Sequence, residues 1–161
     1  EARVNLTIAQ ALITKTHTHD RKYDKLTVVL DTGASNHMFN DKCFFSKLRT
    51  ASNMPISTGC NKSTLSATAT GTVKLLDKNG TMWTLKGCLY VPDLTANLVA
   101  LSQFAEEIKI KRLGTNSEVY LNKETRPEFV CDAVGGILET KIAMPKEERC
   151  LNTMKLNWHD R

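Results

Sequence analysis

The sequence predicts a mostly β domain with one helix, and three observations carry this prediction. Short apolar runs rich in β-branched residues recur along the 161-residue chain, as expected of strands. Turn signals such as Asn79-Gly80 separate these runs. Only residues 97–107 place apolar side chains at a convincing helical spacing. With 41% hydrophobic and 24% charged residues, the chain is long enough for one soluble domain with a proper core.

The first part of the chain leads up to one aspartate. Residues 4–8 alternate apolar and polar side chains and predict a strand, and residues 24–31 form a β-branched run that ends at Asp31. Residues 42–48 then predict a short helical turn. The side chains of this turn expected to face inward are Phe44, Phe45 and Leu48.

Two hairpins and a set of short strands follow. The polar stretch 57–64 lies between two apolar segments and predicts a hairpin tip, and residues 71–91 predict a second hairpin that turns at Asn79-Gly80. Candidate inward or cross-strand residues of the second hairpin are Trp83, Leu85, Cys88 and Tyr90. Pro92 stops its last strand. After the predicted helix, the expected strands are 108–113, 118–121, 128–131 and 136–142.

These elements suggest four successive segments. They are an N-terminal extension (1–23), a core (24–107), an additional β segment (108–143) and a charged linker (144–161). Because the chain starts at Glu1 rather than Met, we expect it to be a piece of a longer protein.

Charge and cysteine content limit the possible function classes. The net charge is +5 and the pI about 9.0, but lysine and arginine are scattered, which indicates ordinary solvation with a weak tilt toward work near nucleic acid. The five cysteines are widely spaced without a C-x-x-C pair, so free thiols in a reducing compartment are expected. We find no signal peptide and no run of membrane-spanning length, and predict no membrane partner.

Asp31-Thr32-Gly33 is the candidate catalytic motif. A rigid buried strand would hold the Asp31 carboxylate, and Gly33 would allow the close backbone approach that follows. Aspartic protease chemistry needs two carboxylates that share a proton, and the motif occurs once, so the second must come from a second copy of the chain. The alternative is an ordinary strand-to-turn exit, where Asp and Gly are common.

The histidines suggest no metal site. His17 and His19 could bind a metal if their segment were a strand, but nothing nearby completes a site. His37, just after the motif, is expected to be a structural hydrogen-bonding residue rather than a catalytic one. No metal and no organic cofactor is predicted, because the proposed chemistry needs neither.

Two sequence blocks give the chain a family resemblance. Residues 30–38, LDTGASNHM, resemble the protease motif of copia-type LTR retrotransposon polyproteins. Residues 89–94, LYVPDL, followed by 97–102, NLVALS, resemble the second block of the same proteins. The resemblance runs from about residue 24 to 143 and implies a retropepsin-like aspartic protease fold with one C-terminal helix and an extra β segment.

The resemblance also implies roles for single residues. Asp31 would be the catalytic aspartate, Thr32 would hydrogen-bond across the two-fold axis, Gly33 would be the motif glycine, and Ser35 could bond the outer aspartate oxygen. The hairpin near residues 56–69 would be the flap over the substrate, with Gly59, Cys60, Asn61, Lys62 and Ser63 as its substrate-binding residues. The helix would span 98–104.

The family pattern is not matched everywhere. Ala96-Asn97-Leu98 stands where retroviral enzymes have an apolar-apolar-Gly motif, and the flap lacks their glycine-rich tip. Residues 158–161, WHDR, resemble the opening of the family's pre-integrase segment, in which His159 would be the first zinc ligand. The chain stops before the remaining ligands of that module.

The function implied by the resemblance is a homodimeric aspartic endopeptidase that processes a retrotransposon Gag–Pol polyprotein. Its expected location is the cytoplasm, within virus-like particles, where nucleic acid would be only an indirect partner. One alternative is a domesticated or inactive dimer that binds peptides or partners. Another is a fragment that dimerises only within its precursor.

Overall fold

In the computed structural model of the chain, the described residues are 9–10, 23–57, 65–122, 126–134 and 137–145. They form eleven strands and two short 3-10 helices. The strands are β1 (Ala9–Gln10), β2 (Thr27–Asp31), β3 (Met38–Phe39), β4 (Phe45–Ser57), β5 (Leu65–Leu76), β6 (Met82–Tyr90), β7 (Asn97–Ala100), β8 (Ile108–Leu113), β9 (Asn116–Leu121), β10 (Phe129–Val134) and β11 (Ile137–Lys141). The helices are η2 (Lys42–Phe44) and η3 (Leu101–Gln103). The mostly β prediction is therefore confirmed.

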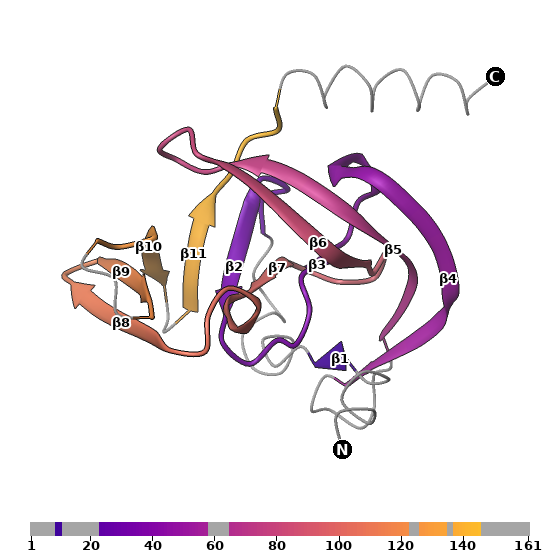
Figure 1. The fold of residues 1–161 in the computed structure, drawn as a ribbon, viewed down its shortest axis with the longest axis horizontal. Helices are drawn as coiled ribbons and strands as arrows, with labels where there is room; N and C mark the ends of the chain where they lie inside the picture. The colour runs from indigo at the N-terminus through magenta and orange to yellow at the C-terminus, as the bar shows by residue number, and fades with distance from the viewer. Residues whose placement is uncertain (1–8, 11–22, 58–64, 123–125, 135–136, 146–161) are drawn as a thin grey trace.

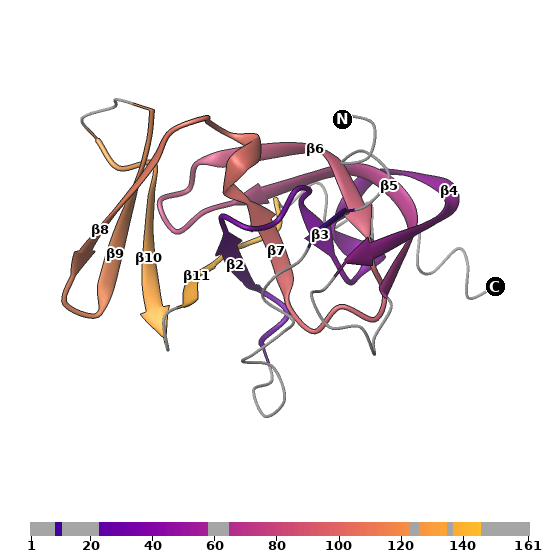
Figure 2. The same ribbon diagram turned by 90° about the horizontal axis from the view of Figure 1, so that it is seen from below.

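All described strands belong to one hydrogen-bonded sheet with β2 and β7 near its middle. The strand order is β1-β4-β5-β6-β3-β7-β2-β11-β10-β9-β8. Figure 1 shows the long curved strands β4, β5 and β6 on one side of β2, and β8 to β11 on the other. Figure 2, seen from below, shows the same division. Strand β2 therefore joins two wings of the molecule.

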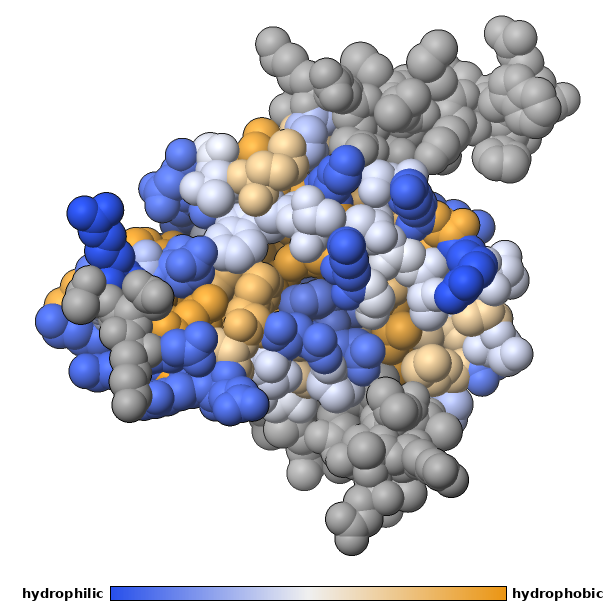
Figure 3. Space-filling view, viewed as in Figure 1, coloured by the Kyte–Doolittle hydropathy of each residue, from blue (hydrophilic) through white to orange (hydrophobic). Residues whose placement is uncertain are grey.

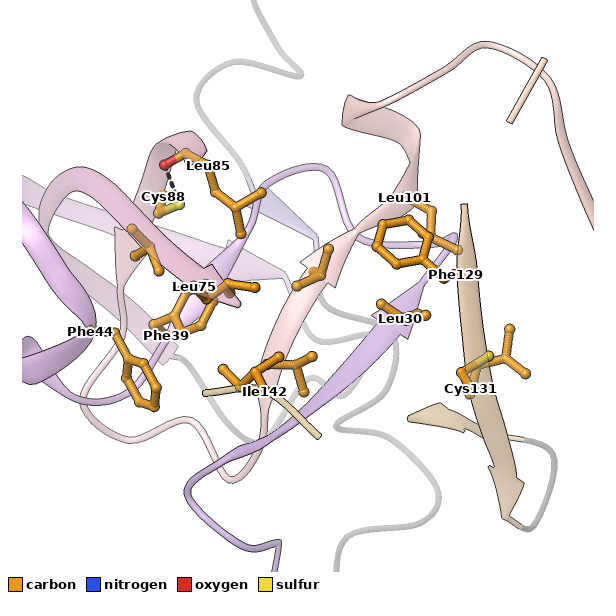
Figure 4. Close-up of a cluster of buried hydrophobic side chains, with 14 of the residues drawn as sticks. Leu30, Phe39, Phe44, Leu75, Leu85, Cys88, Leu101, Phe129, Cys131 and Ile142 are labelled. Atoms are coloured by element: carbon orange, nitrogen blue, oxygen red, sulfur yellow. Dashed lines mark hydrogen bonds between the residues drawn. The ribbon is translucent and has the colours of Figure 1, made fainter. Parts of the chain in front are cut away.

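Strand β2 is buried on both faces, which is why it reads as a continuous apolar run. Val28 and Leu30 belong to one buried cluster, with Phe39, Val73 and other side chains of both wings. Figure 4 shows part of this cluster, with Leu30 between residues from the two wings and the Cys88 thiol donating to the Leu85 carbonyl. Val29 points the other way, into a second cluster. Burial on both faces fixes the strand that ends at Asp31.

The predicted second hairpin is confirmed. Strands β5 and β6 pair antiparallel and turn through Asn79-Gly80, where Gly80 has φ of +80°. Asn79 also donates its N–H to the Asp77 carboxylate, 2.8 Å away. Strand β6 ends at Tyr90, just before Pro92, as expected. Strands β4 and β5 also pair antiparallel, which confirms the arms of the first hairpin, but its tip at 58–64 lies outside the described residues.

The predicted helix over residues 97–107 is wrong. Residues 97–100 form strand β7, which lies between β2 and β3, and only Leu101–Gln103 turn into a 3-10 helix. All four residues of β7 are buried, because neighbouring strands flank it on both edges and apolar clusters cover its faces. Burial between neighbouring strands decides the conformation here. In an apolar run this short, the spacing of side chains does not distinguish a helix from a buried strand.

The prediction for residues 42–48 is only partly correct. Lys42–Phe44 form a 3-10 turn, capped by the Asp41 carboxylate on the Cys43 N–H, but β4 begins already at Phe45. Phe44 and Phe45 are buried as expected, whereas the side chain of Leu48 is 38% exposed rather than inward. Strand alternation explains the difference, because a strand turns Leu48 away from the position that a helix would give it. The predicted strand at 4–8 lies outside the described residues.

Candidate catalytic site around Asp31

Asp31 is the last residue of β2 and begins the loop that leads to β3. It pairs with Ala100 across the parallel β2–β7 ladder, so the site stands on a central strand. The Gly33 N–H donates to Asp31 Oδ1 over 2.7 Å, which closes a tight turn around the carboxylate. A hydrogen bond of this kind fixes the orientation of the carboxylate.

The loop from residue 32 to 37 is held by the 3-10 helix η3. Ser102 donates its hydroxyl to the Ala34 carbonyl over 3.0 Å, and the Gln103 side-chain amide donates to the Ser35 carbonyl. Ala34 itself is buried. Neither Ser102 nor Gln103 has a role predicted from the sequence. Ser102 is the last residue of the second sequence block, and Gln103 follows it directly.

His37 is a structural residue in this loop. Its side chain is 4% exposed, and Nδ1 accepts a hydrogen bond from the Ala100 N–H over 3.0 Å. The ring also packs against Phe104, with centroids 5.4 Å apart. Burial lowers the pKa of His37 to about 4, so the ring stays neutral near pH 7 and its nitrogen is free to accept. The structure thus agrees with the structural role predicted for His37.

Asn97 holds both ends of the loop region and was also missed. This buried amide accepts from the Asn40 N–H over 2.9 Å and donates to the Lys25 carbonyl over 3.2 Å. It therefore connects the entry to β2 with the exit from β3. A buried amide with satisfied partners is a strong constraint on local structure. In the sequence, Asn97 was notable only because retroviral enzymes have an apolar-apolar-Gly motif at this place.

A second carboxylate lies on the same face of the sheet as Asp31. Glu139 of β11 stands opposite Val29 of β2 and is 8% exposed. Because side chains alternate along strands, Glu139, Val29 and Asp31 share one face. Diagonal neighbours of this kind are typically about 7–8 Å apart. Sequence reasoning did not single out Glu139, because its closeness to Asp31 depends on a pairing between distant strands.

An apolar cavity of about 200 Å³ lies against the opposite face of β2. Val28 and Leu30 line it together with Val99, so it does not share the face that carries Asp31. Trp83 stacks on Phe129 at its wall, with ring centroids 4.7 Å apart. Figure 3 shows apolar side chains reaching the surface in the part of the molecule between the two wings.

The predicted site residues divide into two groups. Asp31, Thr32, Gly33 and Ser35 lie together in the β2–β3 turn, where Thr32 is exposed and the Ser35 hydroxyl donates to Asn36 over 2.9 Å. The predicted Ser35–Asp31 bond and all four roles stay predictions. The flap residues Gly59, Cys60, Asn61, Lys62 and Ser63 lie outside the described residues, as do His17, His19 and His159.

The described residues contain neither a metal-binding cluster nor a membrane-spanning helix. No group of three or more His, Cys, Asp and Glu side chains in the described ranges is arranged to hold a metal ion. Within the same part of the chain, no helix is long and apolar enough to span a bilayer.

Comparison with known proteins places the chain in a family. The family described as "Pol polyprotein, beta-barrel domain" matches residues 28–108, about half of the chain, from β2 to the start of β8. No curated protein and no solved structure matches. The matched range contains the Asp31 turn, the β7 strand and the η3 residues that hold the loop. The chain therefore belongs to the Pol polyprotein beta-barrel domain family and is a region of a retroelement Pol polyprotein.

Proposed function

We propose that this Pol region is a homodimeric aspartic endopeptidase of the copia type. It would cleave the Gag–Pol polyprotein inside cytoplasmic virus-like particles. The observation that carries the proposal is the placement of Asp31 at the end of a doubly buried central strand, in a turn closed by the Gly33 N–H. A catalytic carboxylate needs this kind of rigid support from packed elements.

The exposure of Thr32 supports a site completed by a second copy. Its neighbours Asp31 and Gly33 are partly buried, whereas Thr32 is exposed in the single chain. An exposed hydroxyl beside the catalytic carboxylate is available to a second chain approaching along a two-fold axis. Two Asp31 carboxylates would then stand side by side, one from each chain.

The chemistry follows from two aspartates held close together. Like charges at short range do not both ionise readily, so the pair shares one proton. The ionised carboxylate deprotonates a water held between the two chains, and the protonated one donates to the peptide carbonyl oxygen. Water attacks the carbonyl carbon, and the tetrahedral intermediate collapses when the leaving nitrogen is protonated. The two arms of the β4–β5 hairpin would carry the flap that pairs with an extended substrate.

The direct test is self-cleavage of a longer precursor that contains this chain. Asp31→Asn should abolish cleavage and keep the fold, because an asparagine oxygen still accepts from the Gly33 N–H but does not deprotonate water. The matched control is Asp93→Asn, the same change at an exposed loop carboxylate. Circular dichroism reports the fold. Cleavage by Asp31→Asn at the control rate would make the protease assignment wrong.

A mixing experiment tests whether the dyad forms between chains. Adding a molar excess of Asp31→Asn chain to a fixed amount of wild-type chain should suppress cleavage, because most wild-type chains then pair with a variant chain and form dimers with a single Asp31. If Asp31 worked with Glu139 of its own chain, excess variant would leave the rate unchanged and Glu139→Gln would abolish it. That result would overturn the homodimer and keep the protease.

Thr32→Ala tests the predicted bond across the axis. Losing a buried interface hydrogen bond should weaken the dimer by about 1–3 kcal/mol. Sedimentation over a range of concentrations measures this change, and the onset of activity should move with the dissociation constant. A dimer of unaltered strength would remove Thr32 from the interface.

A further inference from the structure

The three strands β4, β5 and β6 carry positive charge only. Their sequences include Lys47, Arg49, Lys74 and Lys86, and contain no aspartate or glutamate. Strands β8 to β11, by contrast, mix lysine and arginine with Glu118, Asp132 and Glu139. Figure 3 shows strongly hydrophilic side chains over the β4–β6 half of the face it presents.

The described ion pairs lie outside this surface. They join Lys25 to Asp41, Lys78 to Asp132, and Lys141 to Asp24. Among the described residues, no carboxylate lies within ion-pair distance of Lys47 or Arg49. Both side chains are exposed, and within the described part of the chain no carboxylate compensates their charge.

Lys47 and Arg49 line a shallow cleft of about 360 Å³ across β4 and β5. Register explains the arrangement, because Lys47 stands opposite Thr72 and Arg49 opposite Thr70. The cleft thus combines two cations with two hydroxyl groups, and no aromatic side chain of the described residues lines it. By alternation along β5, Lys74 continues the same face beyond Thr72.

Two glycines, Gly71 and Gly87, also line the cleft. A Cβ on Gly71 would lie 2.0 Å from the Lys47 carbonyl oxygen, so no larger residue fits there. Gly87 has φ of +66° and lies where the β5–β6 register shifts, with Lys86 and Gly87 together opposite Thr72. Such an irregularity bends the strand and leaves bare backbone, which permits a ligand to approach closely.

We propose that this cleft binds the phosphodiester backbone of nucleic acid without sequence preference. Lysine, arginine and threonine are the side chains that contact phosphate oxygens. Lys47 and Arg49 lie two residues apart on β4, so their Cα atoms are about 6.8 Å apart. This is close to the distance between neighbouring phosphates in a nucleic-acid chain. The lack of a lining aromatic ring among the described residues leaves no platform for base stacking, so recognition rests on charge.

Binding of the full chain to a fluorescein-labelled 20-nucleotide RNA, followed by anisotropy, tests the proposal. Lys47→Gln with Arg49→Gln should lower affinity about tenfold or more at 0.1 M salt. For this single-stranded probe, the salt slope should fall by roughly 0.7 for each phosphate that the variant no longer neutralises. The matched control, Lys109→Gln with Lys111→Gln on β8, removes the same charge where Lys111 faces Glu118, and should change affinity less than twofold.

Three outcomes would overturn the proposal. They are no binding of wild-type chain at 0.1 M salt, equal losses for the two double variants, and competition by polyglutamate as effective as by unlabelled RNA at the same ionic strength. The last would assign the cleft to acidic polypeptides. Asp31→Asn should bind RNA as the wild type does, so failure here is distinguishable from failure of the protease proposal.

Discussion

At the scale of single residues, His37 ties the loop after Asp31 to strand β7. Its Nδ1 accepts from the Ala100 N–H, and Ala100 is the partner of Asp31 in the β2–β7 ladder. This contact, one of those that hold the loop after Asp31, forms only while Nδ1 carries no proton. Histidine just after the motif could be predicted as structural from the sequence. Its partner could not, because the bond joins residues 63 positions apart.

Acidification should weaken the fold through His37. The folded-state pKa, about 4, lies below the ordinary value of 6.5, so the unfolded chain takes up the proton first. The contribution of His37 to the free energy of unfolding is thus complete above pH 6.5. It is lost as the pH falls toward 4, by up to about 3 kcal/mol. His37→Asn keeps an acceptor for the Ala100 N–H but does not titrate. Urea unfolding between pH 7 and 4.5 should show a smaller decrease for this variant. Equal decreases would assign the pH dependence to other groups.

At the scale of elements, the hairpins were predictable and strand β7 was not. Asn79-Gly80 is a local signal, and the turn it predicts is present. Residues 97–100 have apolar spacing that fits a helix, and only their burial between β2 and β3 makes them a strand. Local patterns report turns well, whereas a short segment buried on all sides takes its conformation from its neighbours.

Replacing Gly71 or Gly80 by alanine should lower the free energy of unfolding by different amounts. Gly71→Ala places a methyl group against the Lys47 carbonyl and must separate β4 from β5. Gly80→Ala meets no atom within 4 Å, so only its positive φ opposes alanine. We expect a loss of about 1–2 kcal/mol for Gly80→Ala and a larger loss for Gly71→Ala, measured by urea unfolding. Equal losses would mean that the β4–β5 contact relaxes freely.

Thiol labelling tests the predicted flap. Cys88 is fully buried in β6, and burial raises the pKa of its thiol to about 12, so it should react slowly with iodoacetamide. Cys60 is predicted to lie at the flap tip and should therefore react first. Its alkylation should obstruct the entry of substrate. Mass spectrometry of the folded chain gives the order. Faster labelling of Cys88 than of Cys60 would place the flap elsewhere.

At the scale of the whole molecule, the sheet includes strands that lie beyond the residues matched by the family. The match ends at residue 108, yet β11 pairs with β2 directly, from Leu138 opposite Leu30 to Lys141 opposite Thr27. The large buried cluster also takes Val119, Phe129 and Ile142 from the later part of the chain. The sequence showed these strands as short apolar runs, but their return to β2 depends on pairing that no local pattern encodes.

A chain that ends at residue 107 should therefore fail to fold alone. Without β11, strand β2 becomes an exposed edge, and Val28 and Leu30 lose part of their covering. A chain of residues 1–145 keeps every described strand and is the control. We expect the shorter chain to aggregate or to lack a cooperative thermal transition by circular dichroism. Cooperative unfolding of 1–107 would make 24–107 an independent domain.

The position of β2 also governs when the site can form during synthesis. Its two hydrogen-bonded neighbours are β7 and β11. Val29 therefore pairs with Leu98 and Glu139 only after each of these residues has been synthesised. Contacts this far apart in the chain are slow to close, and the amino-terminal part leaves the ribosome first. On a growing polyprotein, the Asp31 turn therefore stays immature until nearly the whole segment has been translated. Late completion of this kind would delay any cleavage until the chain has been made.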